Sequence, residues 1–187
     1  MKAINGNWAP PVLKATLDLT LANSGSDATD CSAISYNSNY VFFGCLNSPG
    51  REIFSIDVSD EANPTLCANC QRELGGNVND VEISGSYAYI ASSNNSQELQ
   101  ILTISSPTTL NTATLTTFNL TNGNSGSNNA DAIALAKSGN NLYMVRDGGN
   151  QFLRFNVSNP ASPSLSATGS SLTGTPTDIV IAMDMPM

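Results

Sequence analysis

Short apolar segments of one type recur three times along the chain. Each ends in Val or Ile, then Ser and a small polar residue, and each leads into a turn that contains proline. A second type, rich in aromatic residues, precedes each of them. β-Branched and aromatic residues favour strands, and proline suits a chain that leaves a strand. The predicted strands of these two types lie in residues 53–60, 99–106 and 152–159, and in residues 40–43, 87–90 and 142–145.

An aspartate opens a further predicted strand upstream of each aromatic segment, and a fourth copy of this strand opens at Asp178. The intervals between Asp30, Asp80, Asp131 and Asp178 are 50, 51 and 47 residues. A fourth strand is predicted after each proline turn. These last strands are expected over residues 65–70, 110–120 and 165–169. A period of about 50 residues with four short strands is typical of the blades of a β-propeller.

The predicted fold is therefore all-β, with residues 1–187 forming one β-propeller domain of four-stranded antiparallel blades. Three blades are expected to be complete. They span approximately residues 30–75, 78–121 and 129–173. Residues 9–20 resemble the last strand of a unit, and residues 177–183 the first strand. We expect these terminal strands to share or complete a split, partial fourth blade, because an open sheet edge favours aggregation.

The strands that end in Val-Ser or Ile-Ser carry a resemblance to a known family. The chain resembles the LVIVD-repeat β-propellers, whose signature is an apolar Leu-Val-Ile-Val-Asp strand followed by Val-Ser-Asp-Pro. Residues 53–60, 99–107 and 152–160 are similar to it, and so is the aromatic strand in residues 85–91. The resemblance implies a propeller in an exported or surface-attached protein, and it implies no catalytic residue. The signature Asp is kept only at Asp57, so the resemblance gives no repeated ligand.

Composition and charge exclude several classes of function. The net charge of −8 opposes binding to nucleic-acid phosphates or to an anionic membrane surface. No apolar run approaches the roughly 20 residues that span a bilayer, so no membrane insertion is expected. The chain contains no histidine. This excludes Ser-His-Asp and Cys-His catalytic sites and metal sites made of imidazole.

The four cysteines lie close together in the sequence. A hairpin centred on Ser38 would set Cys31 opposite Cys45, near enough for a disulfide, and Cys67 and Cys70 would close a second, very small loop. The alternatives are free thiols or a zinc site, although a four-cysteine zinc site normally uses two close pairs. Disulfides indicate an oxidising compartment, and hence a secreted or cell-surface protein. The start of the chain shows no signal peptide, so either a leader has been removed or the expected compartment is wrong.

The aspartates at the start of each unit are the candidate metal ligands. The first strands of the blades line the channel of a propeller, so Asp30, Asp80, Asp131 and Asp178 would form a ring suited to calcium. In the alternative that we favour, each Asp binds backbone amides near its own strand, and no cofactor is needed. The loop 146–150 has the composition of a cation loop, but a tight turn requires Asp-Gly there in any case.

These observations favour a non-enzymatic, extracellular or cell-surface propeller for binding, adhesion or scaffolding. A protein or a surface glycan is the expected ligand, and a homo-oligomer is one way to complete the propeller. Two alternatives stay open: a calcium-dependent hydrolase of the lactonase kind, and a purely structural repeat segment of a longer surface protein. The fold by itself does not decide among them, because propellers host unrelated activities.

Overall fold

The computed structural model describes residues 12–17, 19, 30–47, 50–120, 130–169 and 172–182. Its strands form three four-stranded antiparallel sheets, in which each strand pairs with the next along the chain. The first sheet contains β1 (Cys31–Asn37), β2 (Tyr40–Cys45), β3 (Ile53–Asp57) and β4 (Gln71–Arg72). The second contains β5 (Val78–Ser84), β6 (Tyr87–Ser92), β7 (Leu99–Thr103) and β8 (Thr114–Phe118). The third contains β9 (Ala132–Ser138), β10 (Asn141–Arg146), β11 (Phe152–Asn156) and β12 (Ser164–Thr168).

The all-β prediction and the three four-stranded units are therefore confirmed, while the last strand of the first two units differs from the sequence-based expectation. In the first unit, Thr65 makes only an isolated bridge to Asp57, and the strand follows at β4. In the second unit, residues 107–112 form a 3₁₀-helix, which Ser106 caps by accepting a hydrogen bond from the amide of Thr108. Proline favours the start of a helix as well as the end of a strand, which explains the difference.

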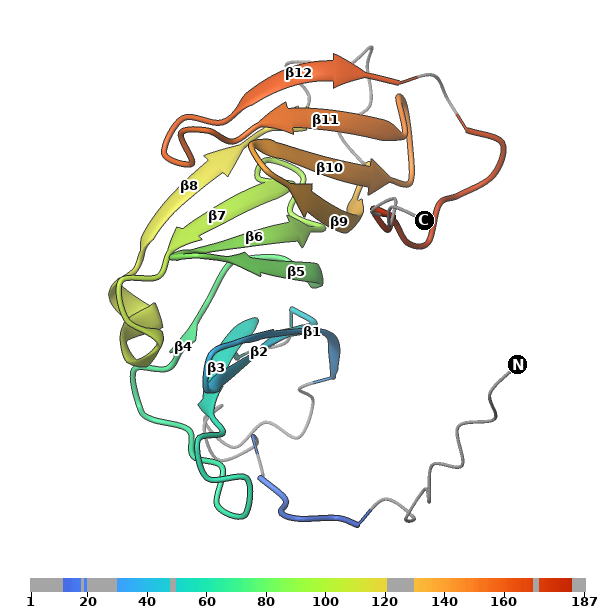
Figure 1. Cartoon of the computed structure of the whole chain (residues 1–187). Coiled ribbons are helices and arrows are strands. Elements are labelled where there is room, and N and C mark those ends of the chain that lie inside the picture. Colours follow the sequence, from blue (N-terminus) through green and yellow to red (C-terminus); the bar gives the residue numbers. More distant parts are fainter. Residues whose placement is uncertain are drawn as a thin grey trace, which may run out of the picture.

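The three sheets stand one above another, with the first strand of each on the same side (Figure 1). β1 lies against β5, and β5 lies against β9. The fourth strands lie on the opposite, outer side (Figure 1). The arrangement agrees with the expectation that the first strands face the inside of a propeller. No fourth sheet closes the row among the described residues.

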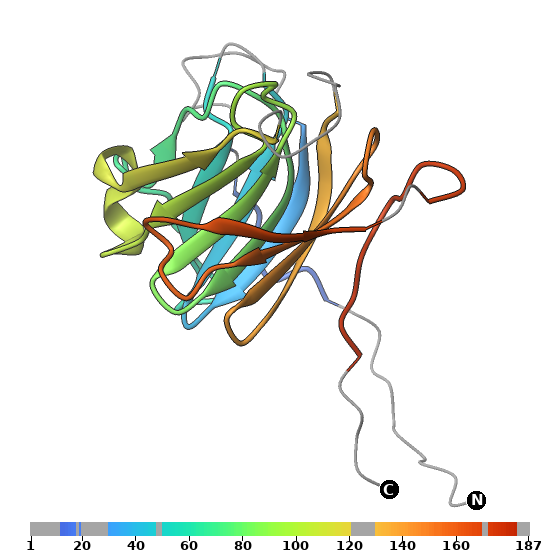
Figure 2. The same ribbon diagram turned by 90° about the horizontal axis from the view of Figure 1, so that it is seen from above.

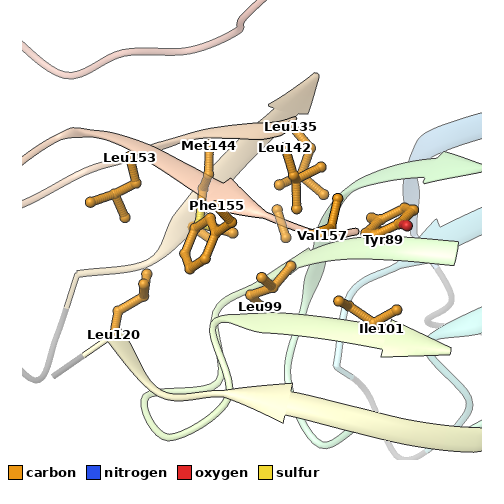
Figure 3. Close-up of a cluster of buried hydrophobic side chains, with 12 residues drawn as sticks. Tyr89, Leu99, Ile101, Leu120, Leu135, Leu142, Met144, Leu153, Phe155 and Val157 are labelled. Atoms are coloured by element: carbon orange, nitrogen blue, oxygen red, sulfur yellow. The ribbon is translucent and has the colours of Figure 1, made fainter. Parts of the chain in front are cut away.

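Two apolar cores hold the sheets together, one in each gap between neighbouring sheets. The core between the second and third sheets contains Tyr89, Leu99, Met144 and Phe155 (Figure 3). The core between the first and second sheets contains Phe42, Ile53 and Leu102, among others. The strands of the middle sheet thus alternate between two packed faces, which explains their near-continuous apolar runs.

A β-bulge occurs at the same place in all three sheets. The extra residue is Ser32 in β1, Asn79 in β5 and Ile133 in β9, in each case six residues before the turn to the second strand. Bulges increase local twist and re-aim the neighbouring side chains. Since three chemically different residues occupy the bulge, no residue type in the sequence marks it.

Both expected disulfides are present. Cys31 pairs with Cys45 across β1 and β2, and Cys67 with Cys70 in the loop before β4. The first pairing depends on the bulge. The turn pairs Asn37 with Tyr40, so an unbroken register would place Cys31 opposite residue 46, and the extra Ser32 shifts it by one to Cys45. No cysteine is left for the zinc or free-thiol alternatives.

The described parts of the termini do not form strands. Residues 12–17 and 19, and residues 172–182, run as irregular chain. The segment 172–182 lies outside the sheets, as Figure 2 shows in red. The split fourth blade expected from residues 9–20 and 177–183 is not formed by these described parts, and the rest of those ranges lies outside the described residues. Where the structure describes the chain, none of its helices is long and apolar enough to cross a membrane.

Candidate functional site

The four candidate aspartates do not occupy equivalent positions in the repeat. The carbonyl oxygens of Asp30 and Asp131 accept hydrogen bonds from the amides of Leu46 and Asp147, and the equivalent carbonyl in the second unit belongs to Asn77. Asp80 lies three residues further on, inside β5. The positions equivalent to Asp30 are therefore Asn77 in the second unit and Asp131 in the third. The sequence intervals concealed this offset because the loops between units differ in length.

Asp80 links two neighbouring sheets through backbone amides. One carboxylate oxygen accepts a hydrogen bond of 2.8 Å from the Val81 amide, and the other accepts a hydrogen bond of 2.7 Å from the Leu135 amide of β9. Burial raises the pKa of Asp80, and the nearby negative charge of Asp178 raises it further. The Asp178 carboxylate itself accepts a hydrogen bond from the Ile179 amide. Both side chains thus bind amides, as the alternative interpretation of the aspartates anticipated.

The described residues contain no group of three or more acidic or cysteine side chains arranged to hold a metal ion. Asp131 lies directly before β9, where its amide donates a hydrogen bond of 2.7 Å to the carboxylate of Asp147. Burial and the charges of Asp147 and Glu98 raise the pKa of Asp131. Asp147 therefore fastens the loop 146–150 to the start of β9, which is a structural use of the loop.

A buried arginine belongs to the same loop. Arg146 is fully buried at the end of β10, and its Nε donates a hydrogen bond of 2.8 Å to the carbonyl of Asn150. Burial lowers the pKa of Arg146, and the negative charges of Glu98 and Asp147 oppose that shift. Arg146, Glu98, Asp131 and Asp147 form a charged cluster at the loop end of the second and third sheets.

A repeated carboxylate or amide clasp was not found by sequence reasoning. The buried residue just before the third strand of each sheet is Glu52, Glu98 or Gln151. Its side-chain oxygen accepts a hydrogen bond from the backbone amide that follows the fourth strand. The amides belong to Leu74, Leu120 and Leu172, the last two at 2.9 and 2.7 Å. Each clasp fixes the chain where it leaves one unit for the next.

Two apolar grooves lie on the free faces of the outermost sheets. A groove of about 380 Å³ on the first sheet is lined by Ile34, Val41, Phe43, Ile56 and Val58, with Leu17, Leu19 and Pro64 at its side. A groove of about 360 Å³ on the third sheet is lined by Tyr143, Phe152 and Ser138, together with residues 179–181. The Tyr143 and Phe152 rings stack with their centroids 6.0 Å apart.

Comparison with known proteins identifies the repeat and finds structures of similar fold. The family model of the LVIVD repeat matches residues 75–115 and 129–169, which contain the second and third sheets. No curated protein matches the chain in sequence. The crystal structure of the computationally designed Ika4 protein is similar, with 12% identity and a TM-score of 0.58 over 87% of this chain and 85% of that chain.

A second designed protein, Ika8, is similar with 11% identity and a TM-score of 0.55, over 82% of this chain and 41% of that chain. At such low identity both similarities concern the fold alone. The first sheet lies outside the residues matched by the family model, yet it repeats the strand order, the bulge and the clasp of the other two.

Proposed function

This chain contains two LVIVD repeats, and from that premise we propose that it is a non-enzymatic β-propeller module for binding or scaffolding outside the cytoplasm. The three sheets are three blades of the propeller. Closed propellers have four to eight blades, so further β-structure completes the ring. The ligand is a protein or a glycan of a cell surface, bound by the loops at one end of the blades.

The clasp is the observation that carries the proposal. At the equivalent positions Glu52, Glu98 and Gln151, the buried side-chain oxygen accepts a hydrogen bond from a backbone amide of the chain itself. The same holds for Asp80 and Asp147. Carboxylates used in this way support the framework, whereas a hydrolase needs carboxylates free to bind a metal ion, a water molecule or a substrate.

The two disulfides support a location outside the cytoplasm. Disulfides persist in secreted proteins and on cell surfaces, and they are rare where glutathione and thioredoxin keep thiols reduced. Both bridges lie in the first unit. Fusion of the chain to a reporter that is active only after export, expressed in its natural host with the complete gene, would test this location.

The loops that join the second and third strands form the proposed binding end. Asn47 and Asn95 are exposed there, at the end of the sheets opposite the turns that contain Ser86 and Asn140. The test compares the wild-type chain with Asn47→Glu/Asn95→Glu on arrays of immobilised glycans and of extracellular proteins. The matched control is Ser86→Glu/Asn140→Glu, which adds the same charge at the opposite end.

We expect the wild-type chain to bind a glycan or protein on the arrays. The Asn47→Glu/Asn95→Glu variant should bind about tenfold or more weakly, since a charge in a neutral polar contact is costly. The control variant should retain the wild-type affinity. Hydrolysis of lactone or glycoside substrates that a chelator abolishes would contradict the proposal and favour the calcium-dependent enzyme. Absence of both binding and hydrolysis would instead favour a purely structural repeat segment.

A further inference from the structure

The chain makes one type of interface between sheets twice. In the second sheet, five apolar residues face the first sheet: Val81, Ala88, Ile90, Leu102 and Ile104. Strand pairing and the hairpin turns define their equivalents in the third sheet. These equivalents face the second sheet: Leu135, Leu142, Met144, Phe155 and Val157. Each sheet therefore packs on the sheet before it through the same five positions.

Among the described residues no sheet lies before the first sheet, and the same five positions line a groove there, with Ile56 buried and the other four exposed or half-buried. They are Ile34, Val41, Phe43, Ile56 and Val58, all of which line its groove. We name these five residues the first-sheet face. All of them are apolar, as in the two sheets where these positions are buried. Ile34 is 64% exposed, whereas its equivalents Val81 and Leu135 are buried.

The third sheet shows the complementary half. Phe42 and Ile53 of the first sheet pack toward the second, and their equivalents Tyr89 and Leu99 pack toward the third. In the third sheet these positions are Tyr143 and Phe152, which line the other groove. We name these two residues the third-sheet face. The two ends of the chain thus expose the two different halves of an interface that occurs twice inside it.

We propose that a second copy of this chain occupies both faces. The third-sheet face of one copy packs on the first-sheet face of the other, and the reverse contact closes a ring of two chains. A contact between two different faces can close into a ring when the rotation per step allows it. Two chains of three sheets give six sheets, within the range of four to eight blades that propellers form.

The terminal segments are incomplete covers for these faces. Leu17 and Leu19 border one groove and residues 179–181 the other, but neither segment forms a strand. Ile34 stays exposed, and Val180 is 76% exposed. A pleated apolar face is covered fully by another sheet packed about 10 Å away, as in the two interfaces within the chain. A second copy supplies such a sheet, and the terminal segments move to the rim.

The test measures the mass of the purified 187-residue chain by light scattering coupled to size exclusion, over a range of concentrations. We expect twice the 19.5 kDa mass of one chain. Ile34→Glu blocks the first-sheet face and Tyr143→Glu the third-sheet face. Each variant alone should raise the dissociation constant roughly 100-fold or more, because each takes a charged side chain out of water in both contacts of the ring. Ser105→Glu, on an exposed loop of the middle sheet, is the control and should leave the mass unchanged.

Mixing the two blocked variants gives the decisive result. One intact first-sheet face and one intact third-sheet face remain, so we expect a one-to-one complex of Ile34→Glu with Tyr143→Glu. Circular dichroism checks that each variant folds. If Tyr143→Glu does not fold, Arg154→Glu replaces it, because Arg154 is exposed and pairs with Tyr143 on the same face of the third sheet.

A wild-type chain that stays monomeric at every concentration would overturn the proposal. If such a monomer associates only after removal of residues 1–20, the terminal segments are the covers. A dimer that survives Tyr143→Glu but not Ile34→Glu would also overturn it, since two first-sheet faces would then be in contact. The assembly does not involve the loop end, so its failure would leave the proposed binding function untouched.

Discussion

Among individual residues, buried acidic side chains mainly serve the backbone. Glu52 accepts the amides of Leu74 and Gly75 with one carboxylate oxygen, while its other oxygen is buried without a hydrogen-bond partner. The third unit uses Gln151 at the equivalent position. The clasp therefore requires a side-chain oxygen and does not require a charge.

Replacing Glu52 tests the clasp through its dependence on pH. Glu52→Ala should lower the free energy of unfolding by about 1–3 kcal/mol, because two amides lose their acceptor. Glu52→Gln keeps the acceptor. Burial raises the pKa of Glu52 above its ordinary value, so protonation favours the folded state. Protonation of Glu52 contributes its full stabilisation below about pH 4, and this stabilisation is lost as the pH rises through the raised pKa of Glu52.

We therefore expect Glu52→Gln, which does not titrate there, to gain stability relative to the wild type between about pH 4 and pH 7. Urea unfolding followed by circular dichroism at several pH values measures this difference. Glu61→Gln, at an exposed loop position, is the control and should show no such trend. A difference that is constant with pH would show that Glu52 titrates normally.

The first hairpin turn carries a side chain where the other two have none. Ser38 has a φ of 57°, and glycine occupies the equivalent positions at Gly85 (59°) and Gly139 (54°). Ser38→Gly should stabilise the protein by about 0.5–1 kcal/mol, because glycine adopts this conformation without steric cost. Gly85→Ser is the reverse change and should destabilise by a similar amount. Thermal melts of both variants measure the effect. Shifts of the melting temperature in the same direction for both variants would contradict it.

Among the strands, the repeated bulge sets which side chains meet. It brings Cys31 opposite Cys45 in the first sheet, and it lies one residue before Asp80 in the second. A shift of one residue turns every following side chain to the other face of the sheet. The bulge is therefore as important for the disulfide as the two cysteines themselves.

The two disulfides should differ in their effect on stability. Cys31 and Cys45 are 14 residues apart and Cys67 and Cys70 only 3, so the first bridge restricts the unfolded chain more. Replacing the first pair by alanine should cost about 3 kcal/mol and replacing the second about 2 kcal/mol in the chain-entropy estimate. Denaturant unfolding measures both, and alkylation of the denatured wild-type protein should label no thiol. A larger loss of stability on replacing Cys67 and Cys70 than on replacing Cys31 and Cys45 would contradict this order.

In the folded chain as a whole, the size of one side chain sets the local spacing between the first two sheets. A Cβ added to Gly44 would lie 2.9 Å from the Cβ of Val78 and 3.0 Å from the Cβ of Ala33, in the gap between the first and second sheets. The equivalents of Gly44 are Ala91 and Val145, so the other sheets have room there. The first two sheets approach each other more closely at this point.

Gly44→Ala should lower the stability by about 1–3 kcal/mol, because the packed core cannot accept the added methyl group. Val78→Ala removes the Cγ1 of Val78, which lies closest to the added methyl group. The double variant should therefore be more stable than the sum of the two single changes implies, by a coupling of about 1 kcal/mol. Denaturant unfolding of the three variants measures it. Simple additivity would show that Gly44 is not a point of contact between the sheets.

The sequence alone determined the first three strands of each unit and their grouping into three units. These features depend on residues near one another in the chain: apolar alternation, Tyr40–Phe43 and its equivalents, and the turn at Ser38. The all-β sheets followed from them. The position of the fourth strands was less certain, since Pro64 and Pro107 are compatible with a turn, a bridge or a 3₁₀-helix.

Only the tertiary structure decided which side chains come together between units. The bulge at Ser32, Asn79 or Ile133 leaves no trace in residue type, so the offset of Asp80 from Asp30 was invisible. The clasp joins residues 21 or 22 positions apart, across the fourth strand, and any carboxylate or amide can provide it. The two open faces were equally hidden, because a strand with two apolar faces has the same pattern whether or not a neighbouring sheet covers it.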